Sequence, residues 1–334
     1  MIQHPIDADY VLPLRWTDDR AVDELTDYLG ELASWVHVLV VDGSPAALYA
    51  EHDRRWGSMV THVRPEPWPG RNGKVAGVMT GVRRATHDVV VIADDDVRYD
   101  SQTLATVVAR LRSADVVRPQ NAFASLPWHA RLDTARSLLN RSFGSDYPGT
   151  LAVRRDILLG AGGYDGDVLF ENLELLRTVR AVGGAEVCAD DVFVARTPPS
   201  TGHFLRQRVR QAYDDFAQPG RLLAELTLLP AALALSRTPR GLVTALLGIV
   251  ALAEVGRRRH GGIDVFPPSS ALWAPVWVAE RAVCVWIALG ARARGGVRYH
   301  GTRIRRAATP QAVLDSRLAP VRAGREATSI RLHE

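Results

Sequence analysis

Apolar runs alternate with helical patterns from the start of the chain to about residue 200, and this alternation restricts the folds open to it. Short apolar runs bounded by polar turns are typical of buried strands, and four of them precede residue 95: residues 10–14, 36–42, 59–63 and 88–94. Residues 44–57 and 73–87 lie between these runs and carry apolar side chains at helical spacing. Because neighbouring parallel strands need such crossovers, the pattern predicts an α/β fold with a mostly parallel sheet flanked by helices.

The fourth run leads directly into an acidic cluster of three consecutive residues, Asp94, Asp95 and Asp96. Adjacent carboxylates repel one another and are costly at a strand end unless they are solvated, hydrogen bonded or neutralised by a cation. In sheets of this kind ligands bind beyond the carboxyl ends of the strands, where Asp42 also follows an apolar run. The acidic cluster therefore predicts a bound metal ion, and caps for a helix near Ser101 are the alternative interpretation.

Composition supports a large core and limits the partners. The 334 residues are 47% hydrophobic, which suffices for a large α/β domain plus an appendage. Cys188 and Cys284 provide neither a disulfide framework nor metal-ligand spacing. The arginines of residues 281–334 lack interleaved aromatics or a nucleic-acid motif, so we expect no nucleic-acid partner. The first ten residues lack the apolar core of a signal peptide, so we expect the catalytic part on the cytoplasmic side.

After Pro219 the chain becomes apolar in three stretches: residues 222–235, 241–253 and 271–290. Each is shorter or more charged than a standard span of about 20 apolar residues, and Glu280 and Arg281 interrupt the third. They are either short or re-entrant membrane helices, flanked by Arg237, Arg240 and Arg257–Arg259, or core helices of a soluble domain. We favour membrane association, because the preceding part of the chain is long enough to bury its own core.

Five motifs follow one another in a familiar order: "VVDGSP", "RNGKVAGVMTGVRRA", "IADDDV", "GAGGYDGDVLFENLELLRTVRAVGG" and "FLRQRVRQ". Together they resemble the family-2 glycosyltransferases of the GT-A fold. The apolar helices and the segment "ARGGVRYHGTRI" look like the ceramide-glucosyltransferase-like, membrane-associated bacterial branch. The resemblance implies a GT-A catalytic domain over residues 1–215, an apolar helical region over 216–295 and a basic tail over 296–334.

The resemblance also implies roles for the residues of the strand edge. Asp42 would accept the imide N–H of uracil, and Lys74 would approach the nucleotide from the start of a helix. Asp94 would face the ribose, Asp95 would belong to the same donor-binding group, and Asp96 would bind Mg²⁺ or Mn²⁺ bridging the diphosphate. Hard oxygen ligands suit both ions. A turn aspartate at position 42 and a solvated surface lysine at position 74 are the alternative interpretations.

The general base departs from the family pattern. The related enzymes carry Glu-Asp at the start of this helix, whereas this chain has Glu171-Asn172, and an asparagine cannot accept a proton at physiological pH. We predict Glu171 as the base, because a carboxylate partly desolvated by an acceptor can take its proton. Glu174, Asp165 or Asp167 could serve instead, and Glu171 would then only complement the helix dipole. A protein that binds a donor without transferring sugar is a further interpretation.

The segment "FLRQRVRQ" places Gln207 and Arg210 at the spacing of the family's QxxRW motif, with Gln211 where the family has Trp. By resemblance, Arg210 would stabilise charge on the departing diphosphate and Gln207 would contact the donor. The absent Trp weakens the expectation that an acceptor stacks here. For Arg208 we expect a solvated position on a basic helix face.

These features predict an inverting, metal-dependent glycosyltransferase. It would move a sugar from a UDP-sugar to a lipid or lipid-linked glycan at the cytoplasmic face of the membrane. A catalytically silent sugar-nucleotide-binding protein at the membrane is the alternative, favoured by Asn172 and Gln211. A nucleotidyltransferase would have a glycine-rich basic loop after its first strand, and a Rossmann dehydrogenase a GxGxxG motif. The chain has neither.

Overall fold

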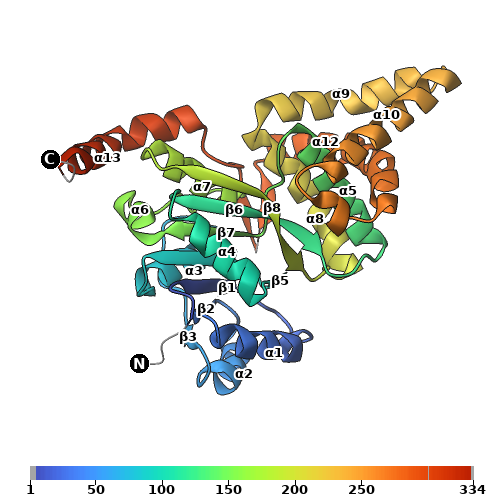
Figure 1. Ribbon diagram of the computed structural model, residues 1–334. Coiled ribbons are helices and arrows are strands. Elements are labelled where there is room, and N and C mark those ends of the chain that lie inside the picture. The colour runs from blue at the N-terminus through green and yellow to red at the C-terminus, as the bar shows by residue number, and fades with distance from the viewer. Residues whose placement is uncertain (1–4, 300, 332–334) are drawn as a thin grey trace. The chain divides into compact units, whose positions relative to one another are not determined.

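The computed structural model of the chain describes residues 5–299 and 301–331 (Figure 1). In this part of the chain a mixed sheet has the strand order β3-β2-β1-β4-β7-β6-β8-β5. Strands β3, β2, β1 and β4 pair in parallel, whereas β7 is antiparallel to β4 and β6. The predicted α/β fold with a mostly parallel sheet is therefore confirmed for the four strands that the apolar runs predict. The strands are β1 (Asp9–Leu14), β2 (His37–Asp42), β3 (Thr61–Val63), β4 (Val89–Ala93), β5 (Val97–Arg98), β6 (Val116–Phe123), β7 (Thr150–Arg154) and β8 (Glu186–Arg196).

By packing, the chain divides into two compact units. The first unit contains the residues up to Pro119, Pro148–Val192 and the residues from Thr309 onward, and the second contains Gln120–Tyr147 and Phe193–Ala308. The chain passes from one unit to the other within β6 and again after β8 begins. The units interleave along the chain, whereas the predicted regions follow one another in sequence.

The first unit surrounds the parallel strands with helices. The strands are buried, as Val11, Leu39 and Val91 illustrate with at most 1% of their surface exposed. The predicted helix over 171–181 is confirmed at both ends, and it stops before Gly183, whose φ of 80° suits glycine. The helices of this unit are α1 (Val22–Ala33), α2 (Ala46–Trp56), α3 (Gly73–Arg84), α4 (Ser101–Arg110), α6 (Arg155–Gly160), α7 (Glu171–Ala181) and α13 (Gln311–Arg331).

The described part of the second unit is helical apart from the ends of β6 and β8 and a small hairpin. Its core packs Leu138 against Phe204, Phe266 and Trp277. The three apolar stretches predicted from the sequence each form one long helix, α9, α10 and α12. The elements are α5 (Trp128–Phe143), α8 (Thr201–Asp214), α9 (Pro219–Leu235), α10 (Pro239–Arg258), α11 (Gly262–Val265), α12 (Ala274–Ala293), 3-10 turns at Asp215–Ala217 and Pro268–Trp273, and strands β9 (Val297–Tyr299) and β10 (Thr302–Ile304).

Helix α3 packs closely on β1 through a glycine. A Cβ atom on Gly81 would lie 2.3 Å from Cγ1 of Val11. We expect Gly81→Ala to lower the free energy of unfolding by about 1–3 kcal/mol, the usual cost of overpacking. Gly30→Ala in α1 is the matched control, because a Cβ there meets nothing within 4 Å. The control should gain up to about 1 kcal/mol from helix propensity. Urea unfolding followed by circular dichroism measures both, and equal stability of the two variants would contradict the close packing.

Candidate active site at the carboxyl edge of the sheet

Polar side chains follow three parallel strands of the first unit at one edge of the sheet. Strand β1 leads to Trp16, β2 ends at Asp42, and β4 leads into the acidic cluster. Leu14 at the end of β1 pairs with Asp42, which places these carboxyl ends side by side. The expected edge of the sheet therefore carries Trp16 in addition to the carboxylates that the sequence singles out.

Lys74, the only lysine of the chain, lies in the first turn of α3. Asn72 caps this helix by accepting the backbone N–H of Lys74. The Lys74 ammonium donates to Oε1 of Glu171 at 2.5 Å and forms an ion pair with Asp94. Burial disfavours the charged lysine, but Asp94 and Glu171 outweigh burial and raise the Lys74 pKa. Lys74 is thus a fixed cation between two carboxylates, and the interpretation as a solvated surface lysine is wrong.

Asp94 is held by the loop before β7 as well as by Lys74. Its backbone N–H donates to the carbonyl oxygen of Gly149 at 2.9 Å. A Cβ on Gly149 would lie 2.9 Å from Oδ2 of Asp94, so a glycine suits this approach. Asp95 and Asp96 lie in a turn, as the alternative interpretation has it, but the acidic cluster does not cap α4: Asp100 caps this helix, by accepting the N–H of Thr103.

Negative charge is concentrated in the acidic cluster, which is half-buried throughout. Burial and the neighbouring charge of Asp96 raise the pKa of Asp95 to about 6, although the indole N–H of Trp16 donates to its carboxylate. A divalent cation would relieve this repulsion, and an all-oxygen donor set suits Mg²⁺ or Mn²⁺. The residues present therefore fit the predicted metal, with Asp96 as its predicted ligand.

Glu171 lies in the first turn of α7 with 6% of its surface exposed. Its carboxylate contacts Lys74 and so belongs to the same constellation as Asp94. The side-chain amide of Asn172 donates to the carbonyl oxygen of Pro148 at 3.1 Å. Asn172, which stands where the enzymes of similar motif order have an aspartate, therefore holds the neighbouring loop, and its contact needs an N–H donor that an aspartate lacks.

The alternative bases lie in different surroundings. Glu174 has no exposed surface, its Oε2 accepts the N–H of Thr309 at 2.6 Å, and burial raises its pKa. Asp167 forms two hydrogen bonds with Arg71, at 2.6 and 2.7 Å, and its own N–H donates to Asp165. Among the four carboxylates considered from the sequence, Glu171 is the one that contacts Lys74 in the described hydrogen bonds and ion pairs.

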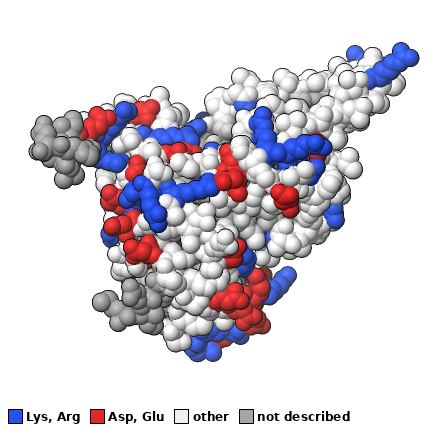
Figure 2. All heavy atoms as spheres, viewed as in Figure 1, with Lys and Arg blue, Asp and Glu red and all other residues white. Residues whose placement is uncertain are grey.

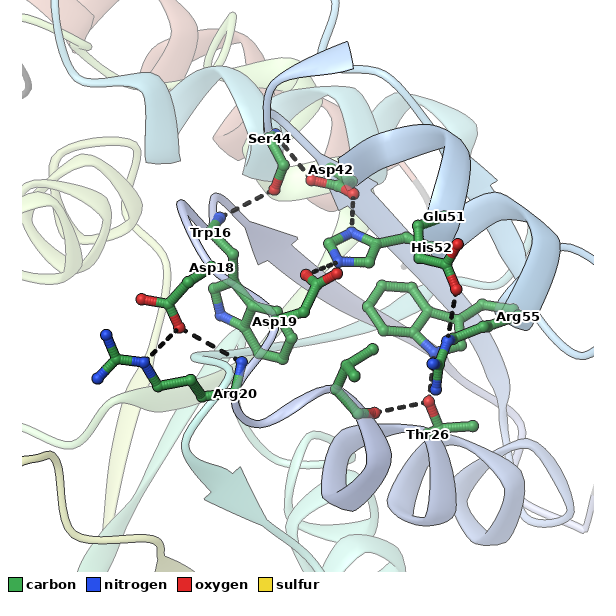
Figure 3. Close-up of polar contacts among 12 residues, drawn as sticks. Trp16, Asp18, Asp19, Arg20, Thr26, Asp42, Ser44, Glu51, His52 and Arg55 are labelled. Atoms are coloured by element: carbon green, nitrogen blue, oxygen red, sulfur yellow. Dashed lines mark hydrogen bonds and ion pairs between the residues drawn. The ribbon is translucent and has the colours of Figure 1, made fainter. Parts of the chain in front are cut away.

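Asp42 is enclosed by protein groups (Figure 3). It has no exposed surface, and its Oδ1 accepts the N–H of Ser44 at 2.8 Å. Its Oδ2 lies 2.6 Å from Nδ1 of His52 and 3.3 Å from Nε2 of His62. Burial opposes ionisation, but hydrogen bonds from His62, Ser44 and His52 outweigh it and lower the Asp42 pKa. Contact with uracil stays a prediction, and a base would have to reach a carboxylate whose two oxygens are already engaged.

Both histidines beside Asp42 face a second carboxylate. Nε2 of His52 lies 3.0 Å from Asp19, and Nδ1 of His62 lies 2.9 Å from Asp53. A neutral imidazole has one N–H, so each ring needs two protons to donate to both of its partners. Although burial disfavours the charged form, hydrogen bonds to Asp42 and Asp53 raise the pKa of His62. These histidines were not predicted from the sequence. His62 could have been, because it lies in the predicted strand that follows the one ending at Asp42.

Gln207 and Arg210 belong to the second unit, on α8. The Arg210 guanidinium lies over the ring of Tyr299, 4.9 Å from its centroid, and Gln207 contacts His203. The roles of Gln207 and Arg210 toward a donor stay predictions that rest on motif spacing.

The expectation of a solvated Arg208 is wrong. Arg208 has 4% of its surface exposed and donates two hydrogen bonds to Glu280, at 3.1 and 2.9 Å. Its side chain also donates to Gln211, the residue at the position of the family's Trp. A basic helix pattern could not reveal this burial, because the acidic partner comes from α12.

Residues 48–139 match the model of the family Glycosyl transferase family 21. The match includes Lys74 and the acidic cluster and ends before Glu171. It names family 21, whereas the order of the motifs resembles family 2. No curated protein matches the chain.

Solved structures with a related backbone include glycosyl-transferring enzymes. A mannosyltransferase from Pyrobaculum calidifontis, in complex with GDP-Man and Mn²⁺, is 19% identical with a TM-score of 0.48, over 96% of this chain and 81% of that one. Glucosyl-3-phosphoglycerate synthase from Mycobacterium tuberculosis, in complex with Mn²⁺, UDP and glucosyl-3-phosphoglycerate, is 18% identical with a TM-score of 0.38, over 60% of this chain and 77% of that one. At these scores the likeness assigns no function.

Proposed function

We propose that this protein is an inverting, metal-dependent glycosyltransferase that uses a UDP-sugar and a lipid or lipid-linked glycan acceptor at the cytoplasmic face of a membrane. The observation that carries the proposal is the bridge that Lys74 makes between Asp94 and Glu171 at the carboxyl edge of β4. The family match over residues 48–139 supports the class of reaction. The choice of UDP rests on the resemblance of the motifs.

The acidic cluster is the proposed donor and metal site. Asp96 would hold Mg²⁺ or Mn²⁺, and the ion would supply the charge that neutralises a departing diphosphate. Lys74 adds a positive charge beside Asp94, and the resemblance implies that it would approach the nucleotide of a donor. Trp16 fixes the carboxylate of Asp95 through its indole N–H, so the cluster is held from β1 as well as from β4.

Glu171 is the proposed general base. Inverting transfer needs one carboxylate that takes the proton of the acceptor hydroxyl as this oxygen attacks the anomeric carbon. The ion pair with Lys74 fixes where the Glu171 carboxylate lies, and its small exposed surface limits competition from bulk water. UDP leaves from the opposite side of the anomeric carbon as the new bond forms, in a single displacement.

The second unit supplies the reason for placing the acceptor at a membrane. The two charges in the middle of helix α12 are turned inward: Arg281 is 1% exposed and donates to Asp215 at 2.9 Å, and Glu280 binds Arg208. Its outer face is apolar, with Val283 50% and Trp286 43% exposed. A helix that faces water has the opposite arrangement.

The helices α9 and α10 continue this apolar surface. In Figure 2 their hairpin is almost entirely uncharged and ends in basic side chains, and Arg237 and Arg240 flank its turn. By length and composition, two segments of the described chain could cross a bilayer: Pro239–Arg258, with 11% of its apolar window buried, and Pro268–Ala293, with 33%. We propose that this surface of the second unit contacts lipid.

Replacing exposed apolar residues of this surface by glutamate should release the protein from membranes. We expect Leu247→Glu combined with Val283→Glu to lower binding to vesicles of anionic phospholipid by at least about tenfold, because a carboxylate at the centre of a bilayer-embedded helix costs about 2.5–3.5 kcal/mol. Val313→Glu in α13 is the matched control, since Val313 is a similarly exposed apolar residue of the first unit. Vesicle flotation measures the bound fraction, and unchanged binding of the double variant would argue against lipid contact.

The function is tested by nucleotide release. Purified protein is mixed with a panel of UDP-sugars and GDP-sugars, Mn²⁺ or Mg²⁺, and a membrane lipid extract. Metal-dependent UDP release that needs the extract supports the transferase. GDP release without UDP release would contradict the choice of donor. Donor binding without release on any acceptor would favour the silent binding protein that Asn172 and Gln211 suggest.

A further inference from the structure

The side chains around Asp42 form the donor set of a transition-metal site. Oδ2 of Asp42, Nδ1 of His52 and Nε2 of His62 lie within 4.8 Å of one another. The oxygen is 2.6 Å from the first nitrogen and 3.3 Å from the second. Two imidazole nitrogens with one carboxylate oxygen suit Zn²⁺, whereas the all-oxygen acidic cluster suits Mg²⁺ or Mn²⁺. The chain thus carries two donor sets of different chemical character at one edge of the sheet.

The second nitrogen of each ring faces a carboxylate that would orient it. Asp19 lies 3.0 Å from Nε2 of His52, and Asp53 lies 2.9 Å from Nδ1 of His62. Metal-binding histidines almost always donate their other N–H to such a group. With a metal ion between them, each imidazole needs one proton only, and both hydrogen bonds to Asp19 and Asp53 remain. Without the ion, two buried rings must each hold two protons to satisfy the same contacts.

The cluster is enclosed and its rings are fixed by stacking. The side chains of His52 and His62 have no exposed surface. His52 stacks on Trp56 and His62 stacks on Tyr49, each with ring centroids 4.4 Å apart. The three ligand residues come from the end of β2, from α2 and from β3. A bound ion would therefore cross-link three elements of the first unit.

A second Asp–His group in the described chain, Asp9, His37 and His87, lacks this arrangement. The Asp9 carboxylate is divided between its partners, since Oδ1 contacts His37 while Oδ2 accepts the backbone N–H groups of Thr86 and His87. The other nitrogen of His37 faces the hydroxyl of Thr61. Two backbone N–H groups and Nδ1 of His87 share Oδ2 of Asp9, whereas both histidines of the first group contact the same oxygen of Asp42, so the Asp9 group serves as a control.

We propose that Asp42, His52 and His62 bind one divalent transition-metal ion, preferably Zn²⁺, with Asp19 and Asp53 orienting the two histidines. This site is separate from the metal predicted at Asp96, and its test does not depend on sugar transfer, although it removes the contact between Asp42 and uracil on which the choice of UDP partly rests. It assigns the Asp42 carboxylate to a metal ion rather than to a nucleobase.

Cobalt titration of the full-length, metal-stripped protein tests the site. The titration uses the Asp96→Asn variant, so that the acidic cluster contributes little. We expect one equivalent of Co²⁺ to give the visible absorption of a site with nitrogen ligands and a coordination number below six, and Zn²⁺ to abolish it. Weak absorption typical of six-coordinate oxygen ligation, or no binding, would overturn the proposal.

Variants then locate the signal. His62→Gln and His52→Gln should each abolish it, and Asp53→Asn, at an exposed carboxylate, should weaken Co²⁺ affinity by about 10-fold to 100-fold. Asp23→Asn, which changes an exposed carboxylate without a histidine partner in the described ion pairs, and His87→Gln should leave it unchanged. If a variant of a buried histidine fails to fold, Asp53→Asn still tests the site. This variant changes an exposed side chain, so it should fold like the parent and give the same circular dichroism. Retention of the full signal in both His62→Gln and Asp53→Asn, or its loss in His87→Gln, would show that the ion binds elsewhere.

Discussion

Asp96→Asn is expected to lower the rate of metal-dependent sugar transfer by about 100-fold to 1,000-fold, the size of effect seen when one stabiliser of developing charge is removed. The variant keeps the shape of the side chain but removes the negative charge that would hold the ion. The remaining rate should need a higher concentration of Mn²⁺ or Mg²⁺ for half-saturation. Initial rates of UDP release across a metal titration measure both quantities.

The control for this variant is Asp100→Asn, because Asp100 lies four residues after Asp96, caps α4 and lies outside the acidic cluster. It should alter stability by no more than about 1–2 kcal/mol and leave the metal dependence unchanged. A rate and a metal requirement in Asp96→Asn equal to those of the parent would remove Asp96 from the metal site.

Glu171→Gln is expected to lower the transfer rate by about 100-fold to 10,000-fold, the usual contribution of a general base. The amide keeps a hydrogen-bond acceptor for Lys74 but cannot take the acceptor proton. Donor affinity, measured by calorimetry with UDP, should change by only a few-fold, since Asp94 still pairs with Lys74. A large loss of rate with little change in UDP affinity indicates a lost base, whereas a large loss of both indicates a disrupted site.

Asn172→Asp is the informative companion of Glu171→Gln. It restores the Glu-Asp pair of the related enzymes but removes the amide that donates to Pro148. Leaving that carbonyl beside a carboxylate should cost about 1–3 kcal/mol of stability. If Glu171 is the base, Asn172→Asp gains no activity. A large rate increase in Asn172→Asp, with no loss in Glu171→Gln, would instead indicate that the natural chain has lost the family's base.

The fold was predictable where local pattern and tertiary structure agree. The strands β1, β2 and β4 were predicted to within one or two residues, because each is a continuous apolar run that is buried on both faces. The antiparallel pairing of β7 with β4 was not predicted, since pairing partners depend on contacts between distant segments rather than on local pattern.

The candidate site shows the same division. Motif order identified Lys74, Glu171 and the acidic cluster. It could not predict that Lys74 binds both Asp94 and Glu171, because Glu171 lies 97 positions after Lys74 in the chain. His52 and His62 were not predicted, because their contacts with Asp42 form only when the chain folds. Arg208 was misread for the same reason, since its partner Glu280 lies 72 positions later.

Because the two units interleave along the chain, the last segment of the first unit is synthesised after the whole second unit. Helix α13 belongs to the first unit and packs against α7, where Glu174 accepts the N–H of Thr309 and Gln311 donates to the carbonyl oxygen of Arg177. The ribosome makes α13 only after α9, α10 and α12. The apolar helices therefore emerge while the helix that carries Glu171 still lacks one of its packing partners. Under the proposed lipid contact, these helices would reach the membrane before the unit that carries Glu171 has its last helix, so membrane binding would precede the final step of folding.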